Sequence, residues 1–349
     1  MKNKNTQAVQ NQKFIGIVIV SYCSGDYVLE CLDTLLASTN QQFKIVVCDN
    51  ASPDDTVDLL RAWADRTQAD FADHAYEDSK TLGLEDFRAV TLLRLSENMG
   101  FAGGVNAGIR ALRPHEDVDL FWVLNPDCQV HPDTIAAYRS CADAHPDFGL
   151  MGSRLIYMDA PNQIQSDGGT ISTTTGLCRN LNQGLMPDVA QTPDISTLDF
   201  ISGSNVIASR AYIETVGLMA EEYFLYYEEV DWAARRGDFP ILWCEDALVY
   251  HHGGTIIGSG AVGRTPTAFA NYFNFRNRIW YMRKFHPLRL PTVYIYSILK
   301  VCQFLSRREW KPAMGAFRGA FGLPPSREIA GRLGDSAQKR AFGNRPKRG

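Results

Sequence analysis

The sequence predicts an α/β fold in which helices cover both faces of a mostly parallel sheet. Four segments have the length and the apolar, β-branched character of buried strands, and helix-like segments separate them along the chain. Strands that are apolar on both sides are typical of a parallel sheet, because helices then shield each face from water. The chain of 349 residues, 45% of them hydrophobic, is long enough to bury such a core.

These elements alternate strictly in the N-terminal part of the chain. The strand-like runs are FIGIVIVSY (14–22), FKIVVCDN (43–50), VTLLRLS (90–96) and DLFWVLN (119–125). The helix-like segments between them are 26–38, 52–66 and 100–112. In the second of these, Ser52 can cap the helix N-terminus and Pro53 fits its first turn. Residues 69–89 are acidic and show no periodic pattern, which predicts a surface loop.

The alternation ends near residue 150, and a loop-rich region follows. Residues 162–197 are rich in Gly, Ser, Thr and Gln, a composition that suits a binding wall built from loops. Residues 221–239 indicate a turn followed by a helix, and the aromatic, basic segment from residue 261 on predicts further helices. One of them, 290–305, is apolar but shorter than the ~20 residues that span a bilayer, so we expect it to lie on a surface or pack against the protein.

Charge is distributed unevenly, although the net charge is only −4. Residues 1–260 hold 17 Lys and Arg against 36 Asp and Glu, whereas residues 261–349 hold 18 against 3. A basic segment on an acidic body suggests a polyanionic partner or an anionic membrane surface. The sequence contains no nucleic-acid-binding motif, so we do not expect nucleic acid to be that partner.

The cysteines and the N-terminus indicate where the protein works. None of the eight cysteines forms a Cys-x-x-Cys pair, which argues against a zinc site or a disulfide framework and favours reduced thiols in the cytoplasm. Residues 1–12 are polar and lack the apolar core of a signal peptide, so we expect a disordered tail.

Polar side chains follow four of the predicted strands at the point where each strand ends. The segments are Ser21-Tyr22, Asp49-Asn50, Ser96-Glu97-Asn98 and Asn125-Pro126-Asp127. Ligands bind beyond the carboxyl ends of the strands in an open parallel sheet, so this convergence predicts a binding crevice. The first strand is not followed by G-x-G-x-x-G, which argues against a dinucleotide site. The glycines of NMGFAGGVNAG (98–108) allow either close approach to a phosphate or ribose, or tight packing of helix on sheet.

Three further motifs each have two interpretations. Asp127 either offers a carboxylate to a hard divalent cation such as Mn²⁺ or Mg²⁺, or caps a helix that starts near Pro132. Glu228 and Glu229 either provide acid–base chemistry or favour the N-terminus of a helix. His251 either completes a metal site or is a structural residue, and the loop GGTIIGSG that follows it could fold over a bound ligand.

Taken together, the motifs resemble those of the family 2 glycosyltransferases with the GT-A fold, and more narrowly their bacterial rhamnosyltransferase-like branch. The resemblance covers roughly residues 14–285 and is carried by IVIVSY, IVVCDNASPDDT, LSENMGFAGGVNAGI, WVLNPDCQVHPDT, ISGSNVIASR, YFLYYEEVDWAARR and VYHHGG. It implies a Rossmann-like catalytic domain over 13–260, with a nucleotide-sugar-binding half (13–130) and an acceptor-binding half (131–260). Residues 261–349 would then form a basic, aromatic helical extension.

The resemblance implies roles for the metal-binding and acid–base residues. Asn125-Pro126-Asp127 matches the family's shortened D-x-D element, in which the last aspartate binds a divalent metal held by the nucleotide-sugar diphosphate. Asn125 replaces the first aspartate. His251 matches a histidine that completes the metal shell, and His252 beside it is ambiguous. Glu229 matches the general base, where the family usually has aspartate, and Glu228 is the second candidate.

The same resemblance implies contacts with the nucleotide sugar. Asp49 matches the acidic residue that contacts a pyrimidine base, and Ser21 and Tyr22 lie at the strand end beside that base. The residues that match the N-x-G loop near the ribose are Asn98, Gly100 and Asn106, and Asn125 belongs to the same nucleotide-sugar site.

The implied reaction is an inverting, metal-dependent transfer of a sugar from a nucleotide diphosphate to a hydroxyl group. We expect dTDP-rhamnose as the sugar donor, with UDP-galactofuranose or another UDP-hexose as the alternative. The expected acceptor is a glycan or a polyprenyl-diphosphate lipid of bacterial surface polysaccharide synthesis, which places the protein in the cytoplasm, free or attached to the inner face of the membrane. NYFNFRNRIWYMRKF (271–285) either meets that lipid's diphosphate or anionic headgroups, or forms a charged helix packed on the catalytic domain.

Two other classes of function compete with this prediction. A nucleotidyltransferase also uses an α/β sheet and a divalent cation, but it usually has a basic phosphate loop after the first strand, and SYCSGDYVLE contains no Lys or Arg. A catalytically idle sugar- or lipid-binding module would leave the carboxylates and the histidine unused.

Overall fold

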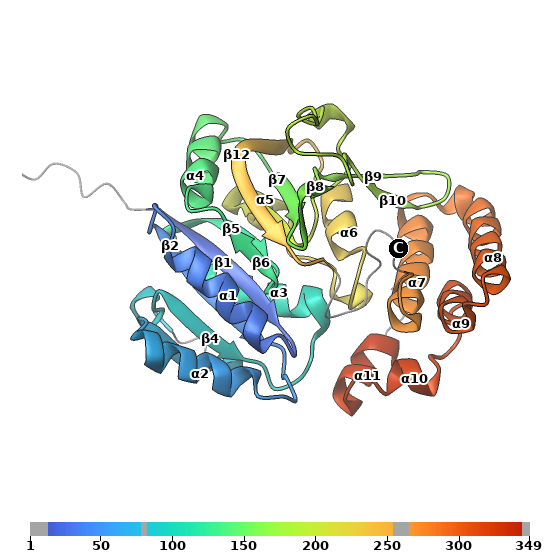
Figure 1. The fold of residues 1–349 in the computed structure, drawn as a ribbon, viewed down its shortest axis with the longest axis horizontal. Coiled ribbons are helices and arrows are strands. Elements are labelled where there is room, and N and C mark those ends of the chain that lie inside the picture. Colours follow the sequence, from blue (N-terminus) through green and yellow to red (C-terminus); the bar gives the residue numbers. More distant parts are fainter. Residues whose placement is uncertain (1–12, 78–81, 254–264, 344–349) are drawn as a thin grey trace, which may run out of the picture.

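The computed structural model describes residues 13–77, 82–253 and 265–343. A ten-stranded sheet runs through the centre, and helices lie on both of its faces (Figure 1). The predicted α/β fold with a helical C-terminal extension is therefore confirmed. The expected tail at 1–12, most of the GGTIIGSG loop and the expected boundary at residue 260 lie outside the described residues.

The first five strands of the sheet are β1 (Phe14–Ser21), β2 (Phe43–Asp49), β3 (Phe71–Ala75), β4 (Val90–Arg94) and β5 (Val118–Leu124). They are followed by β6 (Cys128–Val130), β7 (Leu150–Tyr157), β8 (Ala160–Ser166), β11 (Asn205–Ser209) and β12 (Ile241–His251). The order across the sheet is β3-β4-β2-β1-β5-β11-β7-β12-β6, with β8 paired to β7. The five neighbouring strands β3, β4, β2, β1 and β5 are parallel to one another, as the alternation of strands with helices predicts. The later strands are mixed, and β9 (Gly169–Ile171) and β10 (Cys178–Asn180) form a separate ribbon.

Side chains along β1 alternate between two apolar cores, one on each face of the sheet. Ile17 and Ile19 belong to one core, and Val18 and Val20 belong to the other. The first core is shared with α1 (Gly25–Leu36), α2 (Thr56–Thr67) and α4 (Thr134–Ala144). The second is shared with α3 (Gly100–Leu112), α5 (Arg210–Val216), α6 (Glu228–Ala234) and α7 (Ala268–Phe285). Burial on both sides explains why the strands read as continuous apolar runs.

The prediction of a surface loop over residues 69–89 is wrong in part. This segment contains the edge strand β3 and a short 3-10 helix, η2 (Leu84–Asp86). An edge strand pairs on one side only, and every residue of β3 is half-buried, so no apolar run marks it in the sequence. Asp73 on this strand is held by Arg61 at 2.7 Å and by Arg94 at 2.6 Å.

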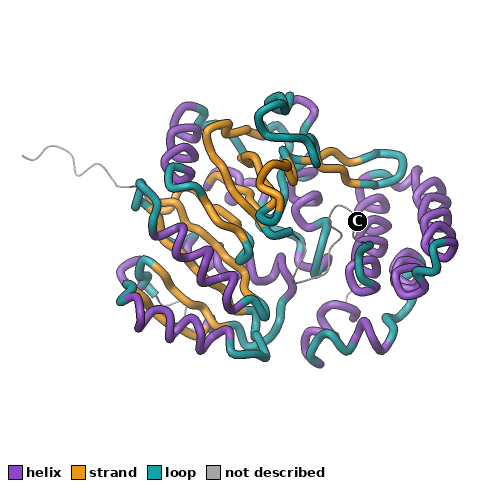
Figure 2. Tube along the Cα trace, in the orientation of Figure 1, coloured by secondary structure: helices purple, strands orange, loops and turns teal. Residues whose placement is uncertain are grey.

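The C-terminal helices lie together beside the sheet, in orange to red in Figure 1 and in purple in Figure 2. After α7 they are α8 (Leu290–Ser306), α9 (Trp310–Ala320), α10 (Arg327–Ala330) and α11 (Asp335–Gly343). α9 packs along α7 and against α8. Within the described part of the chain, every helix is too short or too polar to cross a bilayer.

α7 is largely buried, which favours the second of the two alternatives for residues 271–285, a charged helix packed on the rest of the protein. The side chains of Asn271, Arg276, Asn277 and Arg278 are all buried inside the protein. The Arg276 guanidinium lies 4.2 Å from the ring centre of Trp280. These four residues pack inside the protein: backbone carbonyls accept hydrogen bonds from Asn271, Arg276 and Asn277, and Arg278 Nε meets the Tyr227 hydroxyl.

α9 turns its small residues toward α7. The residues buried in α9 are Ala313, Gly315, Ala316, Gly319 and Ala320. A Cβ atom on Gly315 would clash with the Ala268 carbonyl oxygen of α7, and one on Gly319 would clash with the Tyr272 carbonyl oxygen. The two helix backbones therefore approach each other closely only because glycine stands at these positions, and the large side chains of α9 remain on its outer side.

Gly319→Ala should lower the free energy of unfolding by about 1–3 kcal/mol, because the new methyl group forces α9 away from the Tyr272 carbonyl. The loss should appear even though alanine favours a helix over glycine by ~1 kcal/mol. Urea-induced unfolding followed by tryptophan fluorescence measures it. Gly334→Ala is the matched control, since a methyl group there meets nothing. Equal effects of the two substitutions would contradict this packing.

Candidate active site

The carboxyl ends of four strands lie side by side at one end of the sheet, as the sequence predicts. The register of β1 and β2 puts Ser21 beside Asp49. β5 ends at Leu124 on the other side of β1, so Asn125 leaves the sheet next to them. Asn98 follows β4, which is the neighbour of β2.

Asp127 and His251 are far apart in the sequence and in contact in the structure. β6 begins directly after Asp127 and pairs with the end of β12, so that His251 lies opposite Cys128. His251 Nε2 is 3.1 Å from Asp127 Oδ1, and both side chains are buried. A short antiparallel pairing thus brings together the two residues that the resemblance implies as metal ligands.

The His251 ring is held on its other side by Gln165 of β8. Gln165 Oε1 lies 2.7 Å from His251 Nδ1. An amide oxygen only accepts hydrogen bonds, so with this assignment of the amide Nδ1 carries the ring proton. The lone pair of Nε2 then faces the carboxylate oxygen of Asp127, with Asn125 Nδ2 at 3.2 Å as a donor. Two facing acceptor atoms require positive charge, which either a second ring proton or a metal cation supplies.

The atoms around this pair suit a hard divalent cation, because Mn²⁺ and Mg²⁺ accept carboxylate oxygen and imidazole nitrogen as ligands. Burial opposes ionisation of Asp127, yet the charge and hydrogen bond of His251 outweigh it and hold the pKa of this carboxyl below its usual value. The Cys128 thiol lies within 4.8 Å of both groups. Burial, reinforced by the Asp127 charge, raises its pKa well above the usual value, so it stays protonated. Asp127 and His251 are therefore the two groups that fit such an ion.

His252, which follows His251 in the sequence, points away from the Asp127 carboxylate. His252 Nδ1 lies 3.4 Å from Asp159, and its ring packs edge-on against Tyr27 at 5.1 Å. Because the neighbouring residues of a strand point to opposite sides, only His251 faces the Asp127 carboxylate. The ambiguity between the two histidines in the sequence is resolved by the pairing of β12.

Asp49 ends β2 as a buried carboxylate with one oxygen unused. Its Oδ2 accepts a hydrogen bond from the Ser52 backbone N–H at 3.1 Å. Its Oδ1 is buried and has no hydrogen-bond partner among the described residues. Burial raises the pKa of Asp49. Beside it, Ser21 bonds to Ser24 at 2.7 Å, and Tyr22 is half-buried. A buried, unpaired acceptor costs about 1–3 kcal/mol, and a ligand N–H would satisfy it.

The start of α3 is shaped by Asn98 and Gly100. Asn98 Oδ1 accepts from the Gly100 backbone N–H at 2.9 Å. Gly100 has a φ of +75°, and a Cβ atom there would lie 2.5 Å from the Phe224 carbonyl oxygen, so no other residue fits without rearrangement. The Asn50 side chain adds a second tie by accepting from the Met99 N–H and donating to the Gly100 carbonyl.

Asn106 is the predicted site residue that the structure sets apart. It lies six residues into α3, where its amide donates to the Met219 carbonyl and to Glu221 Oε1, both at 2.9 Å. Its Oδ1 accepts from the Met219 N–H at 3.1 Å. These bonds connect α3 to the segment before α6, and they leave the buried Asn106 side chain committed inside the protein.

The segment before Glu228 is held in an unusual backbone conformation. The non-glycine residues with positive φ in it are Phe224 (65°), Tyr226 (68°) and Tyr227 (75°). Such a conformation costs on the order of 1–3 kcal/mol per residue and persists only where the surroundings hold it. Asn277 of α7 provides the support, because its side-chain amide lies within 2.9 Å of three carbonyl oxygens. These belong to Tyr223, Leu225 and Tyr226.

This strained turn delivers two adjacent carboxyl groups that differ in environment. Glu228 is only 3% exposed, and among the described residues its Oε2 has no hydrogen-bond partner. Burial, followed by the charge of Glu229, raises the pKa of Glu228 well above its usual value. Glu229 is half-buried, and burial raises its pKa to about 6. Burial therefore favours the protonated form of Glu228, whereas Glu229, with a pKa of about 6, is largely ionised at neutral pH and is the less buried of the two.

A short loop connects the two parts of the site. The Ser204 carbonyl accepts from the Asn125 backbone N–H at 3.0 Å, and its hydroxyl accepts from Asn125 Nδ2 at 3.3 Å. A Cβ atom on the neighbouring Gly203 would lie 3.6 Å from the Glu229 Cβ. Ser204 of this loop therefore contacts Asn125, while the adjacent Gly203 lies next to Glu229.

Three supporting residues were not predicted from the sequence: Gln165, Ser204 and Asn277. Ser204 belongs to ISGSN, a polar stretch before a strand, and this position is a signal that could have identified it. Gln165 lies in the loop-rich region and Asn277 in the basic helix, and neither has a local pattern that distinguishes it from its neighbours.

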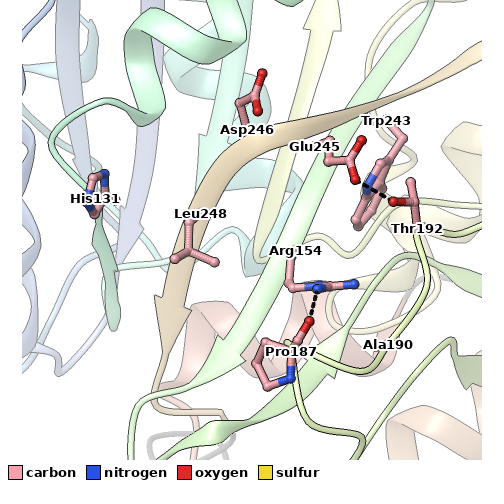
Figure 3. A pocket seen from close by; sticks show the side chains of 9 residues that line it. All are labelled: His131, Arg154, Pro187, Ala190, Thr192, Trp243, Glu245, Asp246 and Leu248. Carbon is pink, nitrogen blue, oxygen red and sulfur yellow. Dashed lines mark hydrogen bonds between the residues drawn. The ribbon is translucent and has the colours of Figure 1, made fainter.

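A separate pocket of about 440 Å³ lies away from these residues (Figure 3). It is lined by His131, Arg154, Pro187, Ala190, Thr192, Trp243, Glu245, Asp246 and Leu248, and none of the predicted site residues is among them. Arg154 is bound to Asp167 and to the Pro187 carbonyl, both at 2.8 Å, and Glu245 accepts from Thr192. Arg154 and Glu245 are thus satisfied by the protein, and the predicted residues gather instead at the strand ends, which we take as the candidate active site.

Two relatives of known activity match most of the chain. The low-salt glycan biosynthesis hexosyltransferase Agl10 of Haloferax volcanii is 23% identical over 282 residues, which are 78% of this chain and 78% of that protein. The N-acetylglucosaminyl-diphospho-decaprenol L-rhamnosyltransferase of Mycobacterium tuberculosis is 26% identical over 272 residues, 73% of this chain and 79% of that protein.

A solved structure and a family profile agree with this fold. The crystal structure of GalNAc-T7 with UDP, GalNAc and Mn²⁺ superimposes with a TM-score of 0.50 at 14% identity. It covers 77% of this chain, which in turn spans about half (51%) of GalNAc-T7. The profile of glycosyl transferase family 2 matches residues 16–180, where the four strand ends and the Asn125-Pro126-Asp127 element lie. Residues 16–180 of the chain therefore match a glycosyl transferase family 2 domain, and the fold has the predicted GT-A architecture.

Proposed function

We propose that the protein is an inverting, metal-dependent glycosyltransferase that moves a sugar from a nucleotide diphosphate to a hydroxyl group. The observation that carries this proposal is the buried Asp127–His251 pair, whose facing atoms, 3.1 Å apart, require a positive charge when the ring proton is on Nδ1. The pair lies at the same sheet edge as Asp49, which has a free buried oxygen, and near Glu229, which is an accessible carboxylate. These are the groups that such a transfer needs.

Each residue has a defined part in the proposed site. Asp127 and His251 would hold the divalent cation, and Gln165 and Asn125 would keep the imidazole in the orientation that this requires. When bound, the cation supplies positive charge that neutralises a departing diphosphate. Asp49 Oδ1 would accept the N–H of a pyrimidine base, while the Gly100 turn lets the ribose approach the backbone of α3.

Glu229 would act as the general base. Its ionised carboxylate accepts the proton of the acceptor hydroxyl while that oxygen attacks the anomeric carbon on the face opposite the diphosphate. The new carbon–oxygen bond forms as the bond to the diphosphate breaks, which inverts the anomeric centre. Glu228 is 3% exposed and burial favours its protonated form, so Glu229 is the better placed of the two carboxyl groups. Asn277 fixes the strained turn and thereby the position of both side chains.

For the substrates we propose dTDP-rhamnose and a glycan or polyprenyl-diphosphate-linked acceptor. The Mycobacterium relative, by its name, transfers L-rhamnose to an N-acetylglucosaminyl-diphospho-decaprenol, and this supports both parts of the proposal. The Haloferax relative is a hexosyltransferase, which supports UDP-galactofuranose or another UDP-hexose as the alternative. A polyprenyl-linked acceptor would bring the protein to the inner face of the cytoplasmic membrane.

The reaction is tested by incubating the protein with Mn²⁺, a polyprenyl-diphosphate sugar and each nucleotide sugar in turn, and separating the products by chromatography. We expect release of the nucleoside diphosphate with dTDP-rhamnose. An idle binding module releases no nucleotide from any of these compounds, and a nucleotidyltransferase releases pyrophosphate from a nucleoside triphosphate instead.

Glu229→Gln should lower kcat by ~10²–10⁴ because the amide cannot accept the proton, while the affinity for the nucleotide sugar stays nearly unchanged. Turnover assays and calorimetric titration of the nucleotide sugar measure the two quantities. Glu228→Gln is the matched control, since the amide has the same size and the Glu228 side chain is only 3% exposed, and kcat should change less than about tenfold. Equal losses in both variants would remove Glu229 from the role of base.

The pH dependence should report the same carboxylate. Since burial raises the pKa of Glu229 to about 6, kcat/KM should rise tenfold per pH unit below about 6 and level off above it. The reason is that only the ionised form accepts a proton. Initial rates measured across this range give the profile. If Glu229→Gln keeps the same acidic limb in its residual activity, the limb belongs to another group.

Asp127→Asn should weaken Mn²⁺ binding by about 100-fold or more, because the neutral amide loses the charge that attracts the ion. Isothermal titration of Mn²⁺ in the presence of the nucleoside diphosphate measures it without turnover. Cys128→Ala serves as the control, and its affinity should stay within about threefold, since a protonated thiol is no ligand for Mn²⁺. Unchanged binding in Asp127→Asn would mean that a ring proton of His251 supplies the positive charge.

A further inference from the structure

The exposed apolar side chains of this protein are concentrated on one part of its surface. Of the fourteen large apolar side chains exposed among the described residues, ten lie between Leu288 and Leu323. They are Leu288, Ile295, Ile298, Leu299, Leu305, Trp310, Met314, Phe317, Phe321 and Leu323. Single exposed apolar residues are ordinary, whereas a dense group of them marks a contact surface.

The members of this group recur at helical spacing. On α9, Trp310, Met314, Phe317 and Phe321 follow one another at intervals of three or four residues, so they form one stripe. The opposite side of α9 consists of alanine and glycine and packs on α7. Most amphipathic helices bury their large apolar residues. α9 does the reverse, and Trp310 is 65% exposed.

α8 continues the same surface. Its exposed apolar residues are Ile295, Ile298, Leu299 and Leu305, again at helical spacing, and Leu299 is 63% exposed. Tyr294 of α8 stacks on Phe321 of α9 with ring centres 5.6 Å apart, and Phe321 in turn contacts Phe317 at 4.9 Å. The outer sides of α8 and α9 are therefore one continuous apolar surface, which we call the α8–α9 face.

Basic residues accompany the α8–α9 face. Residues 283–323 contain eight Lys and Arg and a single acidic residue, Glu309. Arg307 and Arg308 are exposed in the connection between the two helices, and Arg289 is exposed just before α8. None of these three arginines is paired with a carboxylate of a described residue. An apolar surface with unpaired positive charges around it is complementary to a negatively charged apolar partner.

We propose that the α8–α9 face docks on an anionic lipid bilayer. The two helices of 17 and 11 residues would lie in the plane of the headgroups, with the isoleucine, leucine, tryptophan and phenylalanine side chains entering the acyl region. The arginines would meet the lipid phosphates. A second copy of this chain is a poorer occupant, because a symmetric contact through this face would bring two sets of unpaired positive charges together.

The inference is independent of the proposed reaction, because it needs neither a nucleotide sugar nor a metal. It also differs from the lipid alternative for residues 271–285, where Asn271, Arg276, Asn277 and Arg278 are internal. In the structure α9 packs on α7, and the proposed lipid contact is made by α8 and α9, not by α7.

The test is flotation of the full chain with vesicles of phosphatidylcholine, with and without phosphatidylglycerol. The wild-type protein should partition onto the anionic vesicles at least about tenfold more strongly than onto the neutral ones, and added salt should weaken this preference. Trp310→Ser combined with Phe317→Ser should reduce partitioning by about tenfold or more, since two apolar anchors are lost. Arg307→Glu combined with Arg308→Glu should do the same on anionic vesicles only.

The matched control is Leu185→Ser combined with Ile195→Ser, which removes two equally exposed apolar side chains from another part of the surface. Partitioning of this control should stay within about twofold of wild type, and circular dichroism verifies the fold of each variant. Equal flotation of all variants, no preference for the anionic vesicles, or no flotation of the wild type would each overturn the proposal. A dimer in sedimentation experiments that Trp310→Ser with Phe317→Ser dissociates would overturn it too, by making this face a contact between copies.

Discussion

A buried carboxylate oxygen and a buried imidazole nitrogen face each other across 3.1 Å at the edge of the central sheet. With the Gln165 amide oxygen on Nδ1, the ring proton lies there and neither facing atom can donate to the other, so in this tautomer the arrangement requires positive charge at one place. The rest of the site depends on this requirement. Strands β1, β2 and β5 bring their ends to that place, and the β6–β12 pairing keeps His251 opposite Cys128. A metal cation satisfies the requirement in a way that also attracts a diphosphate.

Glu229, the residue that we propose as the general base, and its neighbour Glu228 are positioned by a strained backbone turn. Three residues before Glu228 adopt backbone conformations that are unfavourable in isolation, and one asparagine of α7 supplies hydrogen bonds to the carbonyls around them. The turn places two neighbouring glutamates in unequal environments: Glu228 is buried and its pKa is raised well above the usual value, whereas Glu229 is half-buried with a pKa of about 6. α7 therefore contributes to the site without meeting a substrate. Its buried arginines and asparagines are explained by that internal role.

The same helix also explains the unusual surface of the C-terminal part. Because α7 presents backbone carbonyls to α9, only glycine and alanine fit between them, and the tryptophan and phenylalanines of α9 are displaced outward. A face of this kind is unfavourable in water, by about 25 cal/mol for each Å² of apolar area that stays exposed. A bilayer that covers the face would offset this. The contact between α7 and α9 thus connects the helix that supports the turn before Glu228 to the surface through which the protein would reach a lipid.

Much of this protein follows from local pattern. The apolar runs and the polar residues after them predict a parallel sheet and the edge at which Ser21, Asp49, Asn98 and Asn125 gather, because parallel strands in such a fold end on the same side. The pattern cannot predict which distant segments pair, since register depends on contacts between residues more than a hundred positions apart; the Asp127–His251–Gln165 arrangement required the structure. Local pattern also misses the edge strand β3, because its residues are all half-buried and show no periodicity. It could not decide whether the charged residues of α7 lie on the surface or inside, because that depends on which segments pack around the helix. Periodicity reports which side of a helix is apolar, but whether that side is covered depends on what the remaining chain leaves beside it, as α8 and α9 illustrate.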